Sequence, residues 1–177
     1  MLMNKERQLG RAKNALMSFF EMRLSIPKIY IDATWEGTPV DVLAIDRDGV
    51  GDLHAVLLFP REYSVHGALN ATHDGREVEE KMKQFDHLPA HFKYIVAVDV
   101  SSDQHSTRFG LSDKHIEESF AADGIGRIGF LKIEVPAEGD PRVIVEIKPE
   151  RFRAKVAKLA DEYIQQHEAD WEIRAGV

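Results

Sequence analysis

The sequence predicts an α/β protein in which helices flank a mixed β-sheet. Three observations lead to this class. Four segments repeat apolar residues at helical spacing, six segments alternate or run apolar as strands do, and the order is helix, three strands, helix, strand, helix, two strands, helix. A length of 177 residues with 44% hydrophobic residues fits one compact domain that spans residues 1–177.

The first helix is predicted between residues 4 and 22, where Leu9, Ala12 and Leu16 fall on one face. Pro27 follows its end, because proline lacks the backbone N–H that a helix needs. Three strands then form a meander, and a tight turn at Asp48-Gly49 joins the last two. We expect these strands at residues 29–33, 40–46 and 52–59.

The strand at residues 94–100 is predicted to lie at the centre of the sheet. Its sequence, YIVAVDV, is almost continuously apolar, as in a strand covered on both faces. We therefore expect Val96 and Val98 to be fully buried. The remaining elements are predicted as a helix at residues 77–86, a short helix from Ser112, strands at residues 128–135 and 142–148, and a last helix that begins at Pro149.

Composition excludes several classes of function. The chain has no cysteine, which excludes disulfides, thiolate zinc sites and cysteine nucleophiles. Its net charge of -7 argues against general adhesion to nucleic acid or anionic membrane, so any such contact must be local. No apolar run approaches the roughly 20 residues of a membrane helix, and the first residues lack the apolar centre of a signal peptide. We expect a cytoplasmic protein without a membrane partner.

Three segments carry a resemblance to a known superfamily. VDVLAID, HFKYIVAVDV and GIGRIGFLKIEV, together with the order of helix, three-stranded meander, helix and strand, resemble the PD-(D/E)XK nucleases and their restriction-endonuclease-like fold. The segments are similar to those of the MmcB family, a small bacterial group linked to DNA repair. The similarity covers residues 27–135, and it implies a DNA-related function.

The resemblance implies a metal-binding aspartate at Asp41 and an auxiliary acid at Glu21. The acid and the lysine of the family's D/E-x-K are missing. A turn centred near Gly49 places Asp41 opposite Leu57, so those two groups would fall on Leu57 and Phe59. Neither side chain can bind Mg²⁺ or activate water, because a carboxylate oxygen must hold the cation and a polar group must assist the water. Asp41 is then vestigial, or it binds metal with other ligands.

Displaced ligands would have to come from elsewhere in the chain. Glu77, Glu80, Lys81 and Lys83 lie on the next predicted helix and could project toward Asp41. A literal E-x-K at Glu146-Ile147-Lys148 lies in the last strand, where the polar face of an edge strand explains it better. His66, His73, His87 and His91 lack the spacing of a metal site, and we expect scattered surface histidines.

Basic residues near the C-terminus suggest a second site. If the last helix begins at Pro149, then Arg151, Lys155 and Lys158 form an outer ridge in its first turns. Positive charge there opposes the helix dipole, which suggests a partner that carries phosphate or an acidic protein. The alternative is a solvated face balanced by carboxylates such as Asp161 and Glu162.

These observations leave three functions open. The first is a nuclease-fold domain without catalysis and without a cofactor, with a binding or structural role in a nucleic-acid-related pathway. The second is an active nuclease that holds Mg²⁺ with Asp41 and displaced residues. The third is an interaction domain of unrelated α/β fold, which could form a homodimer.

Overall fold

The computed structural model describes residues 5–46, 51–62, 80, 83–100 and 128–174. Several predictions lie outside these residues. They are the turn at Asp48-Gly49, the short helix from Ser112, half of the helix at residues 77–86 with Glu77 and Lys81, and the histidines His66 and His73. The described residues at the end of that predicted helix, 83–86, are helical.

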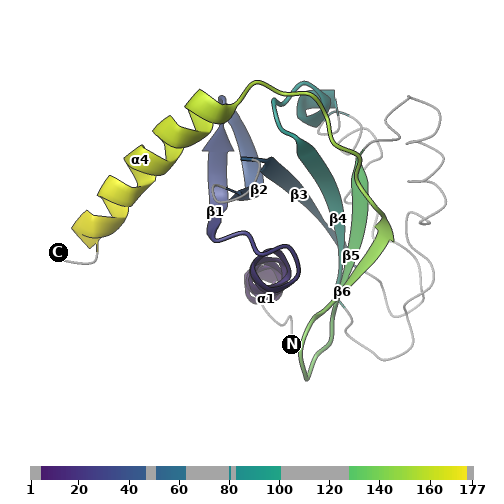
Figure 1. Cartoon of the computed structure of the whole chain (residues 1–177). Coiled ribbons are helices and arrows are strands. Elements are labelled where there is room, and N and C mark those ends of the chain that lie inside the picture. The colour runs from purple at the N-terminus through teal and green to yellow at the C-terminus, as the bar shows by residue number, and fades with distance from the viewer. Residues whose placement is uncertain (1–4, 47–50, 63–79, 81–82, 101–127, 175–177) are drawn as a thin grey trace.

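In the described part of the chain, six strands form one mixed sheet, and the predicted α/β class is confirmed (Figure 1). The strands lie side by side in chain order, with antiparallel neighbours at both ends of the sheet and parallel pairing of β3 with β4 and of β4 with β5. Their bounds are β1 Lys28–Trp35, β2 Thr38–Ile45, β3 Leu53–Glu62, β4 Phe92–Val100, β5 Gly129–Val135 and β6 Arg142–Ile147. β3 runs three residues further than predicted, so Arg61 lies inside the strand.

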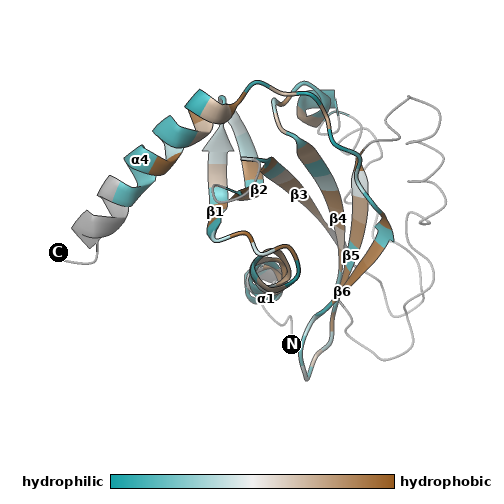
Figure 2. Ribbon diagram, in the orientation of Figure 1, coloured by the Kyte–Doolittle hydropathy of each residue, from teal (hydrophilic) through white to brown (hydrophobic). Residues whose placement is uncertain are grey.

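Helices pack on both faces of the sheet. Helix α1, Lys5–Ser18, continues as a π-helical turn at Phe19–Arg23, and its apolar side packs on the face that carries Val42, Val56 and Val96. Helix α4, Ala157–Arg174, and the short helix near Phe85 pack on the opposite face. The sheet between them is strongly apolar (Figure 2). None of the described helices combines the length and the hydropathy that crossing a membrane requires.

Strand β4 is interior to the sheet, as its sequence predicts. It pairs with β3 on one side and with β5 on the other, and Val96 and Val98 are both 0% exposed. Its two faces belong to different clusters, because Ile95 and Ala97 pack toward α4 while Val96 and Val98 pack toward α1. The continuous apolar run thus reflects burial on both faces.

The prediction that the last helix begins at Pro149 is wrong. Residues 149–156 are not helical, and α4 begins at Ala157. The Phe152 backbone N–H donates to the His91 carbonyl at 2.7 Å, and Phe152, Ala154 and Val156 face inward at a period of two. The backbone of this segment therefore forms a hydrogen bond with the distant residue His91, in place of the bonds that a helix would form. The apolar positions fit a helix and an extended segment equally well, which is why periodicity misplaced the boundary.

The expectation of surface histidines is also wrong for His91, which is buried. Its Nδ1 accepts the Leu53 backbone N–H at 3.0 Å, and its Nε2 lies 3.1 Å from the Ala154 carbonyl oxygen. A neutral imidazole with its proton on Nε2 satisfies both contacts. His91 therefore links the start of β3 to the segment before α4 and is structural.

Candidate functional site

Asp41 lies on β2, and its side chain accepts a hydrogen bond from the backbone of β3. The β2–β3 ladder ends at the pair Val42–Val56, and its register places Asp41 opposite Leu57, as predicted. Just beyond the ladder, Asp41 Oδ2 accepts the Leu58 backbone N–H at 2.7 Å. A buried strand N–H needs such a partner, because leaving it without one costs about 1–3 kcal/mol. The carboxylate thus has a structural role.

Asp41 lies beside a small pocket. This pocket of about 310 Å³ is lined by Asp32, Thr34, Thr38, Leu57, Leu58 and Gln84 among others. Leu57, which lies opposite Asp41, is 8% exposed and belongs to the apolar core. The two carboxylates of this pocket both have partners, because Lys13 binds Asp32 at 2.5 Å and Asp41 accepts the Leu58 N–H. Within the described ranges, no group of three histidine, aspartate or glutamate residues could hold a metal ion.

The other predicted catalytic residues do not complete this site in the described structure. Glu21 lies in the π-helical turn after α1, is exposed, and is absent from the lining of the Asp41 pocket. Glu80 and Lys83 are exposed. Glu77 and Lys81 fall outside the described residues.

A second group of charges lies at the carboxyl ends of the parallel strands. Asp99 on β4 is 4% exposed, and its Oδ2 lies 3.9 Å from Lys132 Nζ on β5. Asp99 pairs in register with Glu134, so period-two alternation places Asp99, Lys132 and Glu134 on one face. Ligands of α/β sheets bind at this end of the strands. Sequence reasoning missed this group. Two apolar strands each carry a charged residue near their end, Asp99 and Glu134, and this pattern could have indicated it.

The predicted basic residues do not lie on one helix. Arg151 and Lys155 lie on the non-helical segment 149–156, and Lys158 lies in α4. Arg151, Arg153 and Lys155 are exposed at alternate positions of the segment 149–156, on the side opposite its apolar residues. In extended chain such neighbours lie about 6.6 Å apart. Arg151 is held in place by Asp52, with Nε and Nη2 at 2.9 and 2.8 Å from Oδ1. Lys158 follows in the first turn of α4 with 89% of its side chain exposed.

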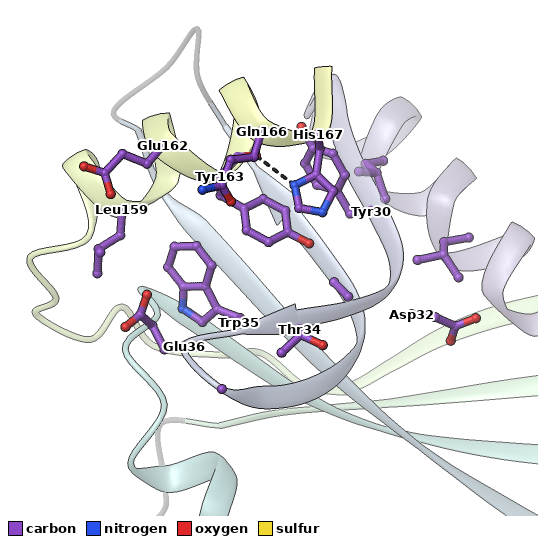
Figure 3. Close-up of a pocket in the computed structure, with 14 residues that line it drawn as sticks. Tyr30, Asp32, Thr34, Trp35, Glu36, Leu159, Glu162, Tyr163, Gln166 and His167 are labelled. Atoms are coloured by element: carbon purple, nitrogen blue, oxygen red, sulfur yellow. Dashed lines mark hydrogen bonds between the residues drawn. The ribbon is translucent and has the colours of Figure 1, made fainter. Parts of the chain in front are cut away.

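A groove of about 850 Å³ separates β1 from α4 (Figure 3). Aromatic rings from both elements meet there. Tyr163 stacks on His167 with ring centres 3.9 Å apart, and Tyr30 and Trp35 contact Tyr163 edge-on at 5.1 and 5.6 Å. Burial, assisted by nearby Tyr30, raises the pKa of Tyr163. Sequence reasoning placed Tyr163 on a packed stripe and missed the groove, which depends on how α4 lies against β1.

No family model matches the chain, and no curated protein matches it. Among solved structures, it is similar to SPO1766, a protein of unknown function from Silicibacter pomeroyi, with a TM-score of 0.51 and 12% identity over 98% of this chain and 94% of that one. That similarity shows a shared fold.

Two further structures overlap only loosely. A repair endonuclease from Pyrococcus abyssi has a TM-score of 0.33 and 18% identity over 71% of this chain and 47% of that one. SfsA from Pyrococcus furiosus, in complex with Ca²⁺, has a TM-score of 0.36 and 17% identity over 80% of this chain and 65% of that one. Both scores are too low to support an inference about function.

Proposed function

We propose that this chain is a nucleic-acid-binding domain of restriction-endonuclease-like fold, a distant MmcB-like protein that does not cleave its ligand at Asp41. The observation that carries the proposal is the basic face of segment 149–156, which continues into α4. The order of helix, three-stranded meander and parallel strand agrees with the fold that the sequence resembles.

The basic face suits a phosphate backbone. Arg153 and Lys155 are exposed at alternate positions, and Lys158, which lies 3.9 Å from Glu162, adds a third cation in the first turn of α4. Arg151 contributes mainly through its pair with Asp52, which fixes the segment against the start of β3. The net charge of -7 repels nucleic acid elsewhere, so we expect weak, local and strongly salt-dependent binding.

Asp41 supports binding without cleavage at its own position. Its Oδ2 accepts the Leu58 N–H, and Leu57 and Phe59 supply no metal ligand and no proton acceptor. Magnesium therefore has no role at Asp41 in this proposal.

A metal-dependent nuclease is the second candidate, and one observation favours it. Asp99, Glu134 and Lys132 bring two carboxylates and a lysine to one face at the carboxyl ends of β4 and β5. Two carboxylates are a common protein contribution to a magnesium site that substrate phosphates complete. This candidate predicts that activity depends on Asp99 and is independent of Asp41.

Replacing Arg153, Lys155 and Lys158 together with glutamine is expected to weaken binding to nucleic acid and to flatten its salt dependence. Each lost phosphate contact lowers the slope of log affinity against log salt by about 0.7 for single strands and about 0.9 for duplex. Fluorescence anisotropy with a labelled single strand and a labelled duplex, at several salt concentrations, measures both quantities.

The matched control replaces Arg7, Lys83 and Arg142 with glutamine, which removes the same charge from exposed positions elsewhere. We expect that variant to bind nearly as wild type does. Equal weakening in both variants would show that only total charge matters, and absence of wild-type binding at low salt would refute the proposal. Competition by polyglutamate as effective as that by DNA would identify an acidic protein as the partner instead.

A further inference from the structure

We propose that the groove between β1 and α4 receives an extended basic segment of another protein, which adds to the sheet beside β1. This inference goes beyond nucleic-acid binding and rests on different residues. The groove is lined on one side by β1 and on the other by α4 (Figure 3).

β1 is an edge strand of the sheet. It stands at the end of the strand order, and β2 is its only strand partner in the described part of the chain. An edge strand presents backbone N–H and C=O groups that can pair with an incoming strand, and peptide recognition by strand addition uses such an edge. Helix α4 runs beside this edge (Figure 1), so an added strand would gain a side wall as well as a backbone partner.

Aromatic side chains line the groove. Tyr30 and Tyr163 are only partly buried, and together with His167 they form an aromatic wall. Aromatic faces attract the cationic groups of lysine and arginine and also pack their aliphatic stems. An alternating strand would place every second side chain against this wall.

The groove also carries negative charge. Three carboxylates, from Asp32, Glu36 and Glu162, line the same groove. Asp32 is bound by Lys13 at 2.5 Å. Glu162 lies 3.9 Å from Lys158 one helical turn earlier, with 55% of its side chain exposed, and Glu36 is exposed at the turn after β1. This rim repels phosphates and favours lysine and arginine. It also disfavours a second copy, because two-fold pairing through β1 would bring like carboxylates together.

The test uses a labelled nonapeptide in which threonine or valine alternates with lysine or arginine, and a matched peptide in which glutamate replaces the basic residues. We expect the basic peptide to bind the full chain and the acidic peptide not to bind. The double variant E36K/E162K should lower the affinity for the basic peptide by about tenfold or more, since two attractive charges become repulsive.

The control E138K/E146K makes the same change of charge at exposed positions near the opposite sheet edge, and it should bind the basic peptide as wild type does. Three results of the peptide-binding experiment would overturn the proposal. They are no binding of the basic peptide at millimolar concentration, equal loss in both double variants, and competition for the groove by single-stranded DNA. A wild-type chain that sediments as a dimer and becomes monomeric in E36K/E162K would identify a second copy as the occupant and would also refute it.

Discussion

Val98→Asp is expected to leave the protein unfolded. Val98 is 0% exposed on β4 and pairs with Pro60 on one side and Ile133 on the other. Its side chain belongs to the apolar cluster between the sheet and α1. A carboxylate there has no partner, and burying it costs several kcal/mol out of a typical total stability of about 5–15 kcal/mol.

Circular dichroism and thermal melting measure this effect. Val145→Asp is the matched control, because Val145 lies on the edge strand β6 and is 36% exposed. We expect the control to fold and to melt within a few degrees of wild type. A Val98→Asp protein that is soluble and melts like wild type would show that β4 is not an interior strand.

The stability of the protein is expected to fall as the pH falls from about 6.5 to about 4, because His54 is buried as a neutral base. Burial is the main cause that lowers its pKa to about 4, with nearby Asp52 opposing the shift. The ring is 7% exposed, stacks on Phe92 at 4.7 Å between ring centres, and has its Nδ1 3.1 Å from the Tyr94 hydroxyl.

The folded and unfolded chains differ in how many protons His54 binds, and this difference makes stability fall as the pH falls. Below the ordinary histidine pKa of 6.5, the unfolded chain binds a proton at His54 while the folded chain does not. The contribution of neutral His54 to stability is therefore present above that pH and is lost progressively down to about pH 4. The whole loss amounts to about 3 kcal/mol, since each pKa unit corresponds to about 1.4 kcal/mol.

Urea unfolding of wild type and His54→Phe at several pH values isolates the contribution of His54 to the pH dependence of stability. The variant keeps an aromatic ring beside Phe92 and cannot titrate, so its stability should depend less steeply on pH across this window. Tyr94→Phe is the control, because it removes the hydroxyl partner and leaves His54 buried, and it should retain the wild-type slope. Parallel curves for wild type and His54→Phe would contradict the assignment.

The sequence was sufficient to predict the strands because their signals are local. The continuous apolar run of β4 indicated an interior strand, and the turn at Asp48-Gly49 indicated the register that places Asp41 opposite Leu57. The start of α4 could not be predicted in the same way. Segment 149–156 is extended because its backbone bonds to His91, about sixty residues earlier in the chain, and no local pattern reports that contact.

The candidate sites depended even more on distant parts of the chain. The predicted turn indicated correctly that Leu57 lies opposite Asp41, but the bond from Leu58 to Asp41 required the strands to be placed side by side. Asp99 and Lys132 meet only through the parallel register of β4 and β5. The groove formed by Tyr30 and Tyr163 required the position of α4 against β1.

Binding without cleavage is the central claim, and a nuclease assay tests it most directly. Plasmid, linear duplex and single-stranded DNA would be incubated with Mg²⁺ or Mn²⁺ and with wild type, Asp41→Ala or Asp99→Asn. We predict no cleavage by any of the three proteins, and a loss of about 1–3 kcal/mol of unfolding free energy in Asp41→Ala, because the Leu58 N–H loses its acceptor. Metal-dependent cleavage by the wild type would contradict the claim. Its loss in Asp41→Ala alone would restore Asp41 as a catalytic ligand, and its loss in Asp99→Asn alone would place the nuclease site at the ends of β4 and β5.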